Sequence, residues 1–215
     1  MQTINTINKI IWDVPHVQAA DVERLKIMRI IDSNRELNIS FHAWELYEYP
    51  TLPQTDKHSW MVKSTTQLEK PRYVIIGFHT NKKNNVTKNM AAFDACALSN
   101  IKVYLNSEAY PYNNLNIDFS KKRFAKLFDM YTYFQESYHE KQPSPLFNME
   151  QFLDICPIAV IDCSKQNEIL NAGTVDFRIE FEHGATLPEN TSCYCLILHD
   201  KIVKYTPLTG LVRSL

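Results

Sequence analysis

The residues best suited to chemistry in this sequence are cysteines and histidines near its C-terminal end. Cys193, Cys195 and His199 have a spacing that, in an extended strand, places both thiols and the imidazole on one face. Such a set could hold zinc, but paired structural ligands usually come from CxxC turns rather than from an extended CxC. Two small buried cysteines in a core strand are the simpler interpretation.

A cysteine nucleophile activated by histidine is the second chemistry to consider. His183 follows a predicted strand, and Cys156 and Cys163 flank an apolar segment, but no local catalytic signature accompanies them. The carboxylates Asp162 and Asp176 fall near strand ends, where solvation and turn capping are their ordinary roles. The sequence therefore nominates no catalytic, cofactor-binding or metal-ligating residue, and we predict a protein that is not an enzyme and needs no cofactor.

Composition limits the possible ligands further. Lys and Arg number 23 against 24 Asp and Glu, so there is no bulk positive field to hold nucleic acid, and the four scattered glycines exclude a glycine-rich phosphate loop. A small basic patch at Lys121–Arg123 with Lys126, expected to open a helix, allows at most a local nucleic-acid contact. On the same predicted helix, Tyr131, Tyr133 and Tyr138 are more simply packing or interface residues than base-stacking ones.

The chain is expected to form one domain over residues 1–215, because no repeat, low-complexity run or linker interrupts it. Residues 1–9 are expected to be a flexible N-terminal segment. There is no recognisable export signal and no apolar window of membrane-spanning length, and the five cysteines form an odd set. These features predict free thiols and a soluble intracellular protein that is not secreted and has no membrane partner.

Several segments show the alternation that is typical of strands with one buried face. Thr174–Glu182 alternates perfectly, Ile101–Leu105 repeats the pattern, and Leu37–Ala43 follows it before the phase slips near Trp44–Leu46, where a β-bulge would account for the slip. Other strands, Tyr73–Phe78 among them, are apolar on both faces, as are Ile158–Ile161 and Cys193–Leu198. Their outer faces must be covered by helices, loops or a neighbouring subunit, which is a hint of assembly.

Three helices punctuate these strands. The first is predicted from Val22, Leu25, Met28 and Ile31 after an Asp21 cap. The second follows Ser120, and the third is a short turn from Asn148 that contains Gln151, Phe152 and Leu153. So few helices among many strands predict an all-β fold, an antiparallel β-sandwich of jelly-roll topology with a few short helices in its loops.

Ordered blocks along almost the whole chain resemble the double jelly-roll major capsid proteins of Polinton/Maverick-type elements and related viruses, including capsid-like reading frames of animal genomes. The blocks are Leu68–Phe78, Val103–Ser107 with Tyr110–Tyr112, Leu115–Phe119, Val160–Glu168, Thr174–Glu182, Tyr194–Lys201 and Tyr205–Gly210. The resemblance implies two facing four-stranded sheets. It also implies self-association into a trimer or larger ring or shell, with other capsid proteins as further partners and a virion as a location. It gives no catalytic residue to carry over.

One departure from that family is the length, because its capsid proteins carry two jelly rolls in tandem and 215 residues hold one. The chain is therefore either a portion of such a protein or a stand-alone host-encoded descendant, which could act instead as a binding module for a protein, glycan or nucleic acid. A third reading is a cupin-like enzyme, which would need converging histidines. The seven histidines are spread singly: His16, His42, His58, His79, His139, His183 and His199.

Overall fold

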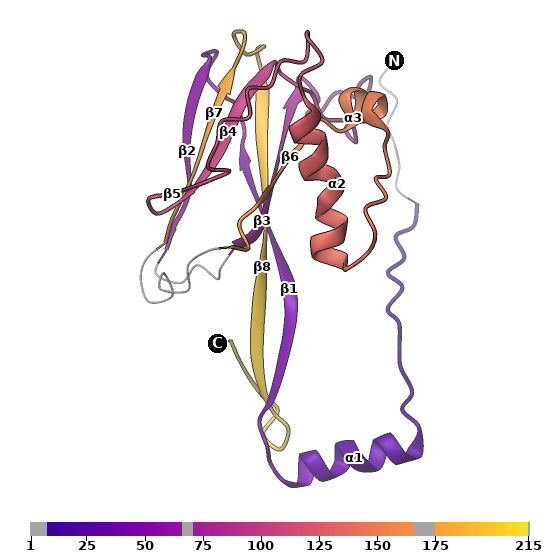
Figure 1. Ribbon diagram of the computed structural model, residues 1–215. Coiled ribbons are helices and arrows are strands. Elements are labelled where there is room, and N and C mark those ends of the chain that lie inside the picture. Colours follow the sequence, from indigo (N-terminus) through magenta and orange to yellow (C-terminus); the bar gives the residue numbers. More distant parts are fainter. Residues whose placement is uncertain (1–7, 66–70, 166–174, 215) are drawn as a thin grey trace. The chain divides into compact units, whose positions relative to one another are not determined.

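A computed structural model describes residues 8–65, 71–165 and 175–214, so part of the predicted flexible segment, residues 1–7, lies outside the described residues. Three helices and nine strands are seen in the described chain (Figure 1). The helices are α1 (Asp21–Asp32), α2 (Ala125–His139) and α3 (Met149–Ile155). The strands are β1 (Leu37–Tyr49), β2 (Lys57–Thr65), β3 (Pro71–Thr80), β4 (Leu98–Leu105), β5 (Glu108–Tyr110), β6 (Ala159–Asp162), β7 (Val175–His183), β8 (Thr191–Thr206) and β9 (Leu211–Ser214).

The strands form two sheets, with the orders β1-β8-β3-β6 and β2-β7-β4-β5. The chain folds back on itself, so that the first four strands pair with the next four in reverse order. β1 pairs with β8, β2 with β7, β3 with β6, and β4 with β5. This is the eight-stranded jelly-roll order, so the predicted sandwich is confirmed. The difference from two four-stranded sheets is β9, which pairs with β8 as a fifth strand.

The β2-β7-β4-β5 sheet owes its inner face to the alternation seen in the sequence. On β7, Phe177, Ile179 and Phe181 are buried, while the residues between them are partly exposed. The antiparallel register places Phe181 opposite Ile101 of β4. Because successive side chains of a strand point to opposite faces, this register gathers the apolar residues of both strands on the core side.

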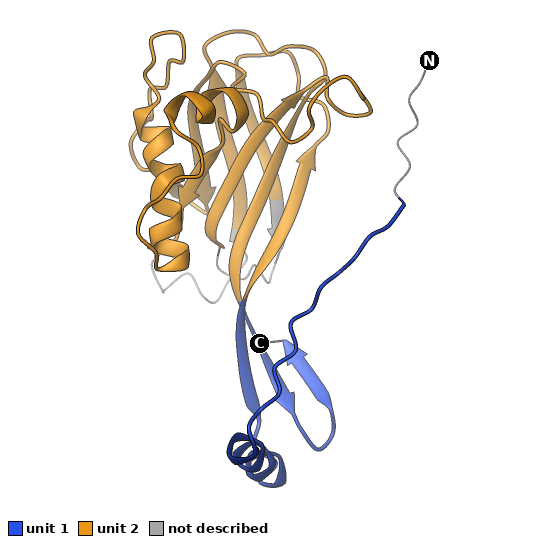
Figure 2. Ribbon diagram, turned by 90° about the vertical axis from the view of Figure 1, so that its right-hand side faces the viewer, with its two compact units in different colours: residues 1–41, 201–215 blue, residues 42–200 orange. Residues whose placement is uncertain are grey.

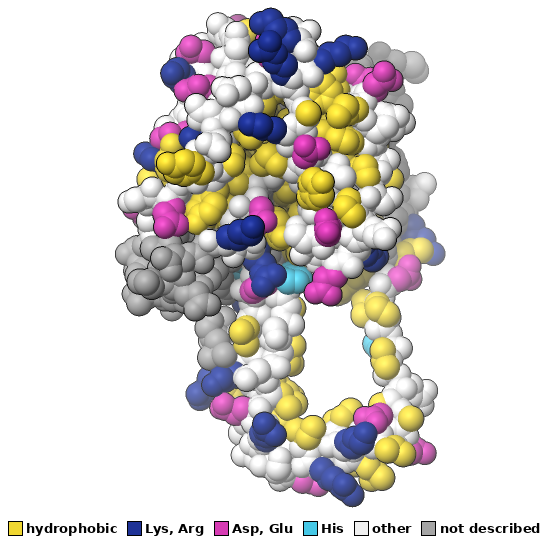
Figure 3. Space-filling model, in the orientation of Figure 1, with side chains coloured by type: hydrophobic (Ala, Val, Ile, Leu, Met, Phe, Trp, Pro, Cys, Tyr) yellow, Lys and Arg dark blue, Asp and Glu magenta, His cyan; other side chains and the backbone are white. Residues whose placement is uncertain are grey.

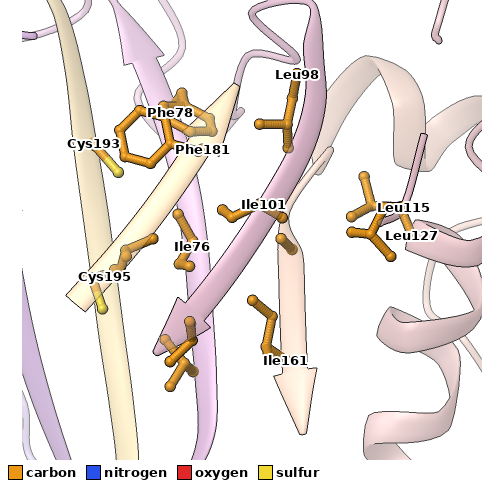
Figure 4. Packing of buried hydrophobic residues seen from close by; sticks show 14 of the residues in the cluster. Ile76, Phe78, Leu98, Ile101, Leu115, Leu127, Ile161, Phe181, Cys193 and Cys195 are labelled. Atoms are coloured by element: carbon orange, nitrogen blue, oxygen red, sulfur yellow. The ribbon is translucent and has the colours of Figure 1, made fainter. Parts of the chain in front are cut away.

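The other sheet supplies the facing half of the core. Val74, Ile76 and Phe78 of β3 lie opposite Ile197, Cys195 and Cys193 of β8, and all six side chains are buried. The Phe78 and Phe181 rings, one from each sheet, meet edge to face with centroids 5.4 Å apart (Figure 4). The core therefore sits between the two sheets, where the twofold period of the strands directs it.

The outer face of β3 is covered by the chain's own segments. Tyr73 is buried beneath α2, its ring 5.0 Å from that of Phe134. Farther along, the ring of Phe93 packs on Gly77, where an added Cβ would lie 2.4 Å from a Phe93 ring carbon. A glycine is required here because any side chain would occupy the space of that ring. Helix and loop thus account for much of the apolar surface that the sequence left uncovered.

The described chain separates into two compact units (Figure 2). The sandwich unit comprises His42–Asp200, and the terminal unit comprises Met1–Phe41 with Lys201–Leu215. The boundary passes through the sequence of β1 and of β8. The expectation of one domain over residues 1–215 therefore stays a prediction.

Local predictions had mixed outcomes. Asn148 caps α3 in a reciprocal capping box with Gln151, as its position suggested. The predicted Asp21 cap is wrong, because Ala20 precedes α1 and Asp21 lies in the first helical turn, where its charge favours the helix dipole. In β1, half-buried and exposed residues alternate without a break from Ala43 to Tyr49. The phase of the apolar residues therefore slips in the sequence because Trp44 and Leu46, which are apolar, stand on the exposed face.

Candidate assembly surface

Exposed aromatic and aliphatic side chains stand on β1 and on α2, and the two elements meet at Trp44 and Tyr138. Trp44 and Leu46 of β1 are 53% and 65% exposed, and Tyr133 of α2 is 57% exposed. The ring of Tyr138 stands 6.1 Å from that of Trp44. We call Trp44, Leu46, Tyr133 and Tyr138 the α2 surface. Figure 3 shows hydrophobic side chains among charged ones over the part of the sandwich unit that holds α2.

Helix α2 positions this surface because its apolar side chains anchor it to the sandwich. Leu127 is fully buried, and the Phe128 ring meets that of Phe152 of α3 at 5.4 Å. Two turns later Phe134 stacks on Tyr138, four residues on, with ring centroids 5.1 Å apart. The i, i+4 spacing places these two rings on one side of the helix, so Tyr138 reaches the residues of β1.

A hollow of about 300 Å³ lies between α2 and the outer side of β3 and β6, and is lined mostly by apolar side chains. Its lining includes Tyr73, Pro111, Tyr133, Phe134 and Val160. The α2 surface therefore has both a protruding aromatic part and a recess, which is the relief that a packed protein interface uses.

Charged groups border the surface and are already paired. Asp200 forms an ion pair with Arg72, whose Nε lies 2.6 Å from Oδ2, and its other oxygen lies 2.8 Å from His42 Nδ1. Glu48 accepts from Lys83 Nζ at 2.9 Å, and this bond holds the pKa of the Glu48 carboxyl below its usual value. An apolar centre with a paired, polar rim is the anatomy of a protein–protein interface.

The cysteine and histidine cluster predicted from the sequence is part of the core. Cys193 and Cys195 share the inner face of β8, and burial raises the pKa of each thiol well above its usual value. His199 is 4% exposed, with Nε2 4.0 Å from Glu45 Oε1. Among the described residues, no three His, Cys, Asp or Glu side chains are grouped so that they could hold a metal ion.

The residues considered for nucleophilic catalysis have structural roles in packing and hydrogen bonding. His183 Nδ1 lies 2.7 Å from the Cys96 carbonyl oxygen, and burial lowers the pKa of this imidazole to about 4. Burial raises the pKa of both Cys156 and Cys163, whereas a cysteine nucleophile needs a lowered one. Asp162 accepts a hydrogen bond from the Ser164 amide, the turn-capping role expected of it. All five cysteines are free thiols.

The basic patch does not open a helix, which corrects the sequence prediction. Lys121–Arg123 lie in the turn before α2, and Lys121 Nζ is 3.1 Å from Asp118 Oδ2. Hydrogen bonds from Ser120 and Lys121 lower the pKa of Asp118 to about 2, so this carboxylate offsets part of the positive charge. Tyr131 packs against Phe152 at 5.1 Å, as a packing residue should.

A separate polar pocket of about 490 Å³ lies at the end of β3. Its lining includes His79, Asn81, Lys83, Asn190 and Tyr194. Asn190 donates to the side-chain oxygen of Asn81 at 2.9 Å, which ties two loops together. Neither ring nitrogen of His79 has a hydrogen-bond partner in the structure, although the side chain is buried. No sequence pattern indicated this pocket, because its residues come from loops far apart in the chain.

The strand order and the exposed side chains define the class of this protein as an antiparallel jelly-roll sandwich with an exposed apolar surface. A family model for the double jelly roll-like domain matches residues 2–203. The chain belongs to the double jelly roll-like domain family. No curated protein sequence matches it.

Three solved structures are similar to the chain at low identity. The structure of the Sputnik virophage aligns with a TM-score of 0.47 and 9% identity, over 83% of this chain and 39% of that one. The mavirus major capsid protein gives 0.40 and 10%, over 84% and 41%. A PBCV-1 protein fitted into a reconstruction of Sputnik gives 0.47 and 10%, over 91% and 54%. The chain thus spans 39 to 54% of the length of these structures.

Among the described residues, no helix is long and apolar enough to cross a membrane.

Proposed function

We propose that this protein is a structural subunit of the capsid type, which assembles with copies of itself and performs no catalysis. The observation that carries the proposal is the α2 surface, where Trp44 and Leu46 stand exposed on the outer face of a rigid jelly-roll sheet. Membership of the double jelly roll-like domain family supports a structural role. The family resemblance extends the proposal to a trimer or larger ring or shell and to residence in a virion.

The chemistry of the surface fits this role. Large aromatic side chains are enriched at the centres of protein interfaces because they bury much area and lose little conformational freedom. Trp44 and Tyr138 provide such rings, and the adjoining hollow can receive a side chain from another subunit. Two carboxylates at the border, Asp200 and Glu48, are paired with Arg72 and Lys83, so covering them leaves neither without a partner.

The test is the mass of the purified full chain in solution, measured by light scattering after size exclusion over a series of protein and salt concentrations. The particles are then viewed by negative-stain microscopy. We expect a discrete oligomer, ring or shell whose population grows with concentration. Replacing Trp44→Ser together with Leu46→Ser should raise the apparent dissociation constant by about tenfold or more, since interface anchors commonly contribute that much.

The matched control is Val86→Ser, because Val86 is a 71% exposed apolar residue of a loop outside the α2 surface. It should leave assembly unchanged. A monomer at every concentration and salt would contradict the proposal. Equal loss of assembly in both variants would indicate non-specific hydrophobic association.

A binding module is the second candidate function, and the polar pocket beside His79 is the observation that favours it. Its lining of amides, a lysine and Tyr194 could recognise a neutral sugar through hydrogen bonds and ring stacking. Calorimetry with a set of neutral oligosaccharides tests this, with Tyr194→Ala as the variant. Saturable binding that the variant loses would support the module, and the absence of heat with every sugar would remove it.

A further inference from the structure

The terminal unit is rich in large apolar residues, but its fold buries none of those that the structure describes. None of its described residues, 8–41 and 201–214, is buried. Sixteen of the 25 exposed large apolar side chains in the described chain nevertheless belong to it, although it contributes only about a quarter of those residues. In monomeric soluble proteins exposed apolar side chains are usually scattered, and concentrations of them mark interaction sites. The exposed apolar side chains of the terminal unit therefore indicate that another surface covers it.

Helix α1 shows the need for covering most clearly. Six of its twelve residues are large and apolar, and none is buried. At about 100° per residue, Val22, Met28 and Ile30 point in directions about 80 to 160° apart around the axis. A helix that is apolar around its circumference is typical of an enclosed element, and twelve residues alone form a marginal helix in water. Figure 3 shows hydrophobic side chains along this helix.

The apolar surface continues beyond α1. Before the helix, Ile10, Ile11 and Trp12 are 63 to 88% exposed. In β9, Leu211 and Val212 are 43% and 58% exposed. These segments flank the helix in sequence or lie in the same unit, so one partner could cover several of them together.

Charge indicates which partner. The terminal unit has eight Lys and Arg against five Asp and Glu, and the sandwich unit has 15 against 19, so their formal charges are +3 and −4. Opposite charges on two surfaces of one protein favour association between copies. A membrane surface fits less well, because helices that lie on membranes carry mainly Lys and Arg on their polar face, while α1 has three acidic and three basic residues.

We infer that the terminal unit is an assembly arm that becomes buried against the sandwich unit of a second copy of this chain. This inference rests on the proposed self-assembly and names the element that mediates it. In an isolated molecule the described residues of the arm form no buried core. In the assembly the apolar sides of α1 and of the segment before it are covered, and its positive charges face the negative sandwich unit of the neighbour.

The first experiment measures hydrogen exchange by mass spectrometry on the full chain at concentrations below and above assembly. Peptides that cover residues 10–32 should exchange within seconds in the monomer and become protected at least about tenfold in the assembly. Peptides of β3 and β7 should be protected in both states. An arm whose exchange is the same in monomer and assembly would overturn the inference.

The second experiment identifies the partner surface. Unlabelled and ¹⁵N-labelled chains are mixed, assembled and treated with a carbodiimide, which joins lysines to carboxylates in direct contact. We expect mixed-isotope links from arm lysines such as Lys26, which is exposed, to Asp or Glu of the sandwich unit. Mixed-isotope links confined to pairs of arms, or links found only within one copy, would show that the sandwich unit of a neighbour is not the acceptor.

A variant pair separates this inference from the proposed function. Leu25→Asp with Met28→Asp should raise the apparent dissociation constant about tenfold or more, and the control Val86→Asp with Leu146→Asp should not, although it adds equal charge at exposed apolar sites of the sandwich unit. Unchanged exchange of β3 shows that each variant is folded. A wild-type chain that never assembles defeats the proposed function, whereas assembly by the α1 variant as tight as by wild type defeats only the arm.

Discussion

Helices α1 and α2 have similar lengths and both carry aliphatic or aromatic residues in about half of their positions, but they meet different surroundings. Leu127 of α2 is fully buried, and Phe134 lies over Tyr73 of β3. In α1 the corresponding apolar side chains, such as Leu25 and Met28, are more than half exposed. The comparison teaches that an apolar pattern shows that a helix needs a partner surface, and does not show whether the same chain provides it.

The two compact units repeat this contrast. In the sandwich unit the strand pairing brings apolar faces together from across the sequence, so the described core lies entirely within it. The terminal unit has strand pairing, as between β8 and β9, but none of its described residues, 8–41 and 201–214, is buried by a second layer. Hydrogen-bonded strands alone give little stability, because most stabilisation comes from the apolar area removed from water.

The largest test of this comparison is the truncation of one phenylalanine in each unit. Phe181→Ala should lower the free energy of unfolding by about 3 to 5 kcal/mol, because Phe181 is 1% exposed and contacts Phe78. Phe41→Ala in the terminal unit, where the ring is 44% exposed, should lower it by less than about 1 kcal/mol in the monomer. Urea unfolding followed by fluorescence gives both values, and similar losses would refute the contrast.

A buried histidine should make the sandwich unit sensitive to acid. Burial lowers the folded-state pKa of His183 to about 4 from the 6.5 expected in the unfolded chain. The unfolded state therefore binds the proton more readily, so His183 has no effect above pH 6.5 and lowers the unfolding free energy as pH falls from 6.5 to 4. The total loss is about 3 kcal/mol.

The measurement compares urea unfolding of the wild type and of His183→Asn at several pH values. The difference between the two curves should widen as pH rises from 4 to 6.5, because only the wild type loses stability on acidification at this site. Parallel curves would show that the imidazole titrates normally in the folded protein.

A smaller change in the unfolding free energy is expected at Gly77 of β3, which the loop bearing Phe93 covers. Gly77→Ala should lower the unfolding free energy by about 1 to 3 kcal/mol, because the new methyl group would overlap the Phe93 ring. Phe93→Ala removes the obstacle, so the Gly77→Ala change should cost less in that background. Additive losses in the double variant would mean that Phe93 does not set the requirement for glycine.

The smallest expected effects concern ion pairs that differ mainly in burial. Lys82 in the sandwich unit is 7% exposed and lies 3.0 Å from Asp94, while Lys26 and Glu23 of α1 are more than half exposed at 2.7 Å. Double-mutant cycles should give a coupling above about 1 kcal/mol for the first pair and below about 0.5 kcal/mol for the second. Added salt should weaken only the α1 pair appreciably, and the reverse order would contradict the assigned burial.

Alternating patterns predicted the sandwich because burial on one face leaves a mark on every second residue. Phe177, Ile179 and Phe181 carried that mark. β3 is apolar on both faces and lacks it, and its outer face is covered by α2 and the loop bearing Phe93. Strands β2, β5 and β9 were not predicted, since β5 and β9 are only three and four residues long and β2 interrupts its apolar residues with polar ones.

The α2 surface was predicted only in kind. Aromatic richness and uncovered strand faces indicated assembly. The exposure of Trp44 and Leu46 could not be predicted, because the apolar residues before them, Leu37–Ala43, alternate in the opposite phase. The polar pocket beside His79 had no sequence signal, because loops that are more than 100 residues apart form it. Patterns within one segment cannot report which segments the fold brings together.

The pairing of β1 with β8 has a consequence for how the molecule is made. β1 begins at residue 37 and cannot pair until β8, which begins at residue 191, has been synthesised. At ribosomal speed, synthesis of the intervening chain takes on the order of ten to thirty seconds. Folding of the β1-β8-β3-β6 sheet is therefore a late event on the nascent chain, and contacts so distant in sequence also form slowly. During that interval both edges of β1 are unpaired, and Trp44 and Leu46 are exposed, so crowded synthesis should favour chaperone capture of this strand.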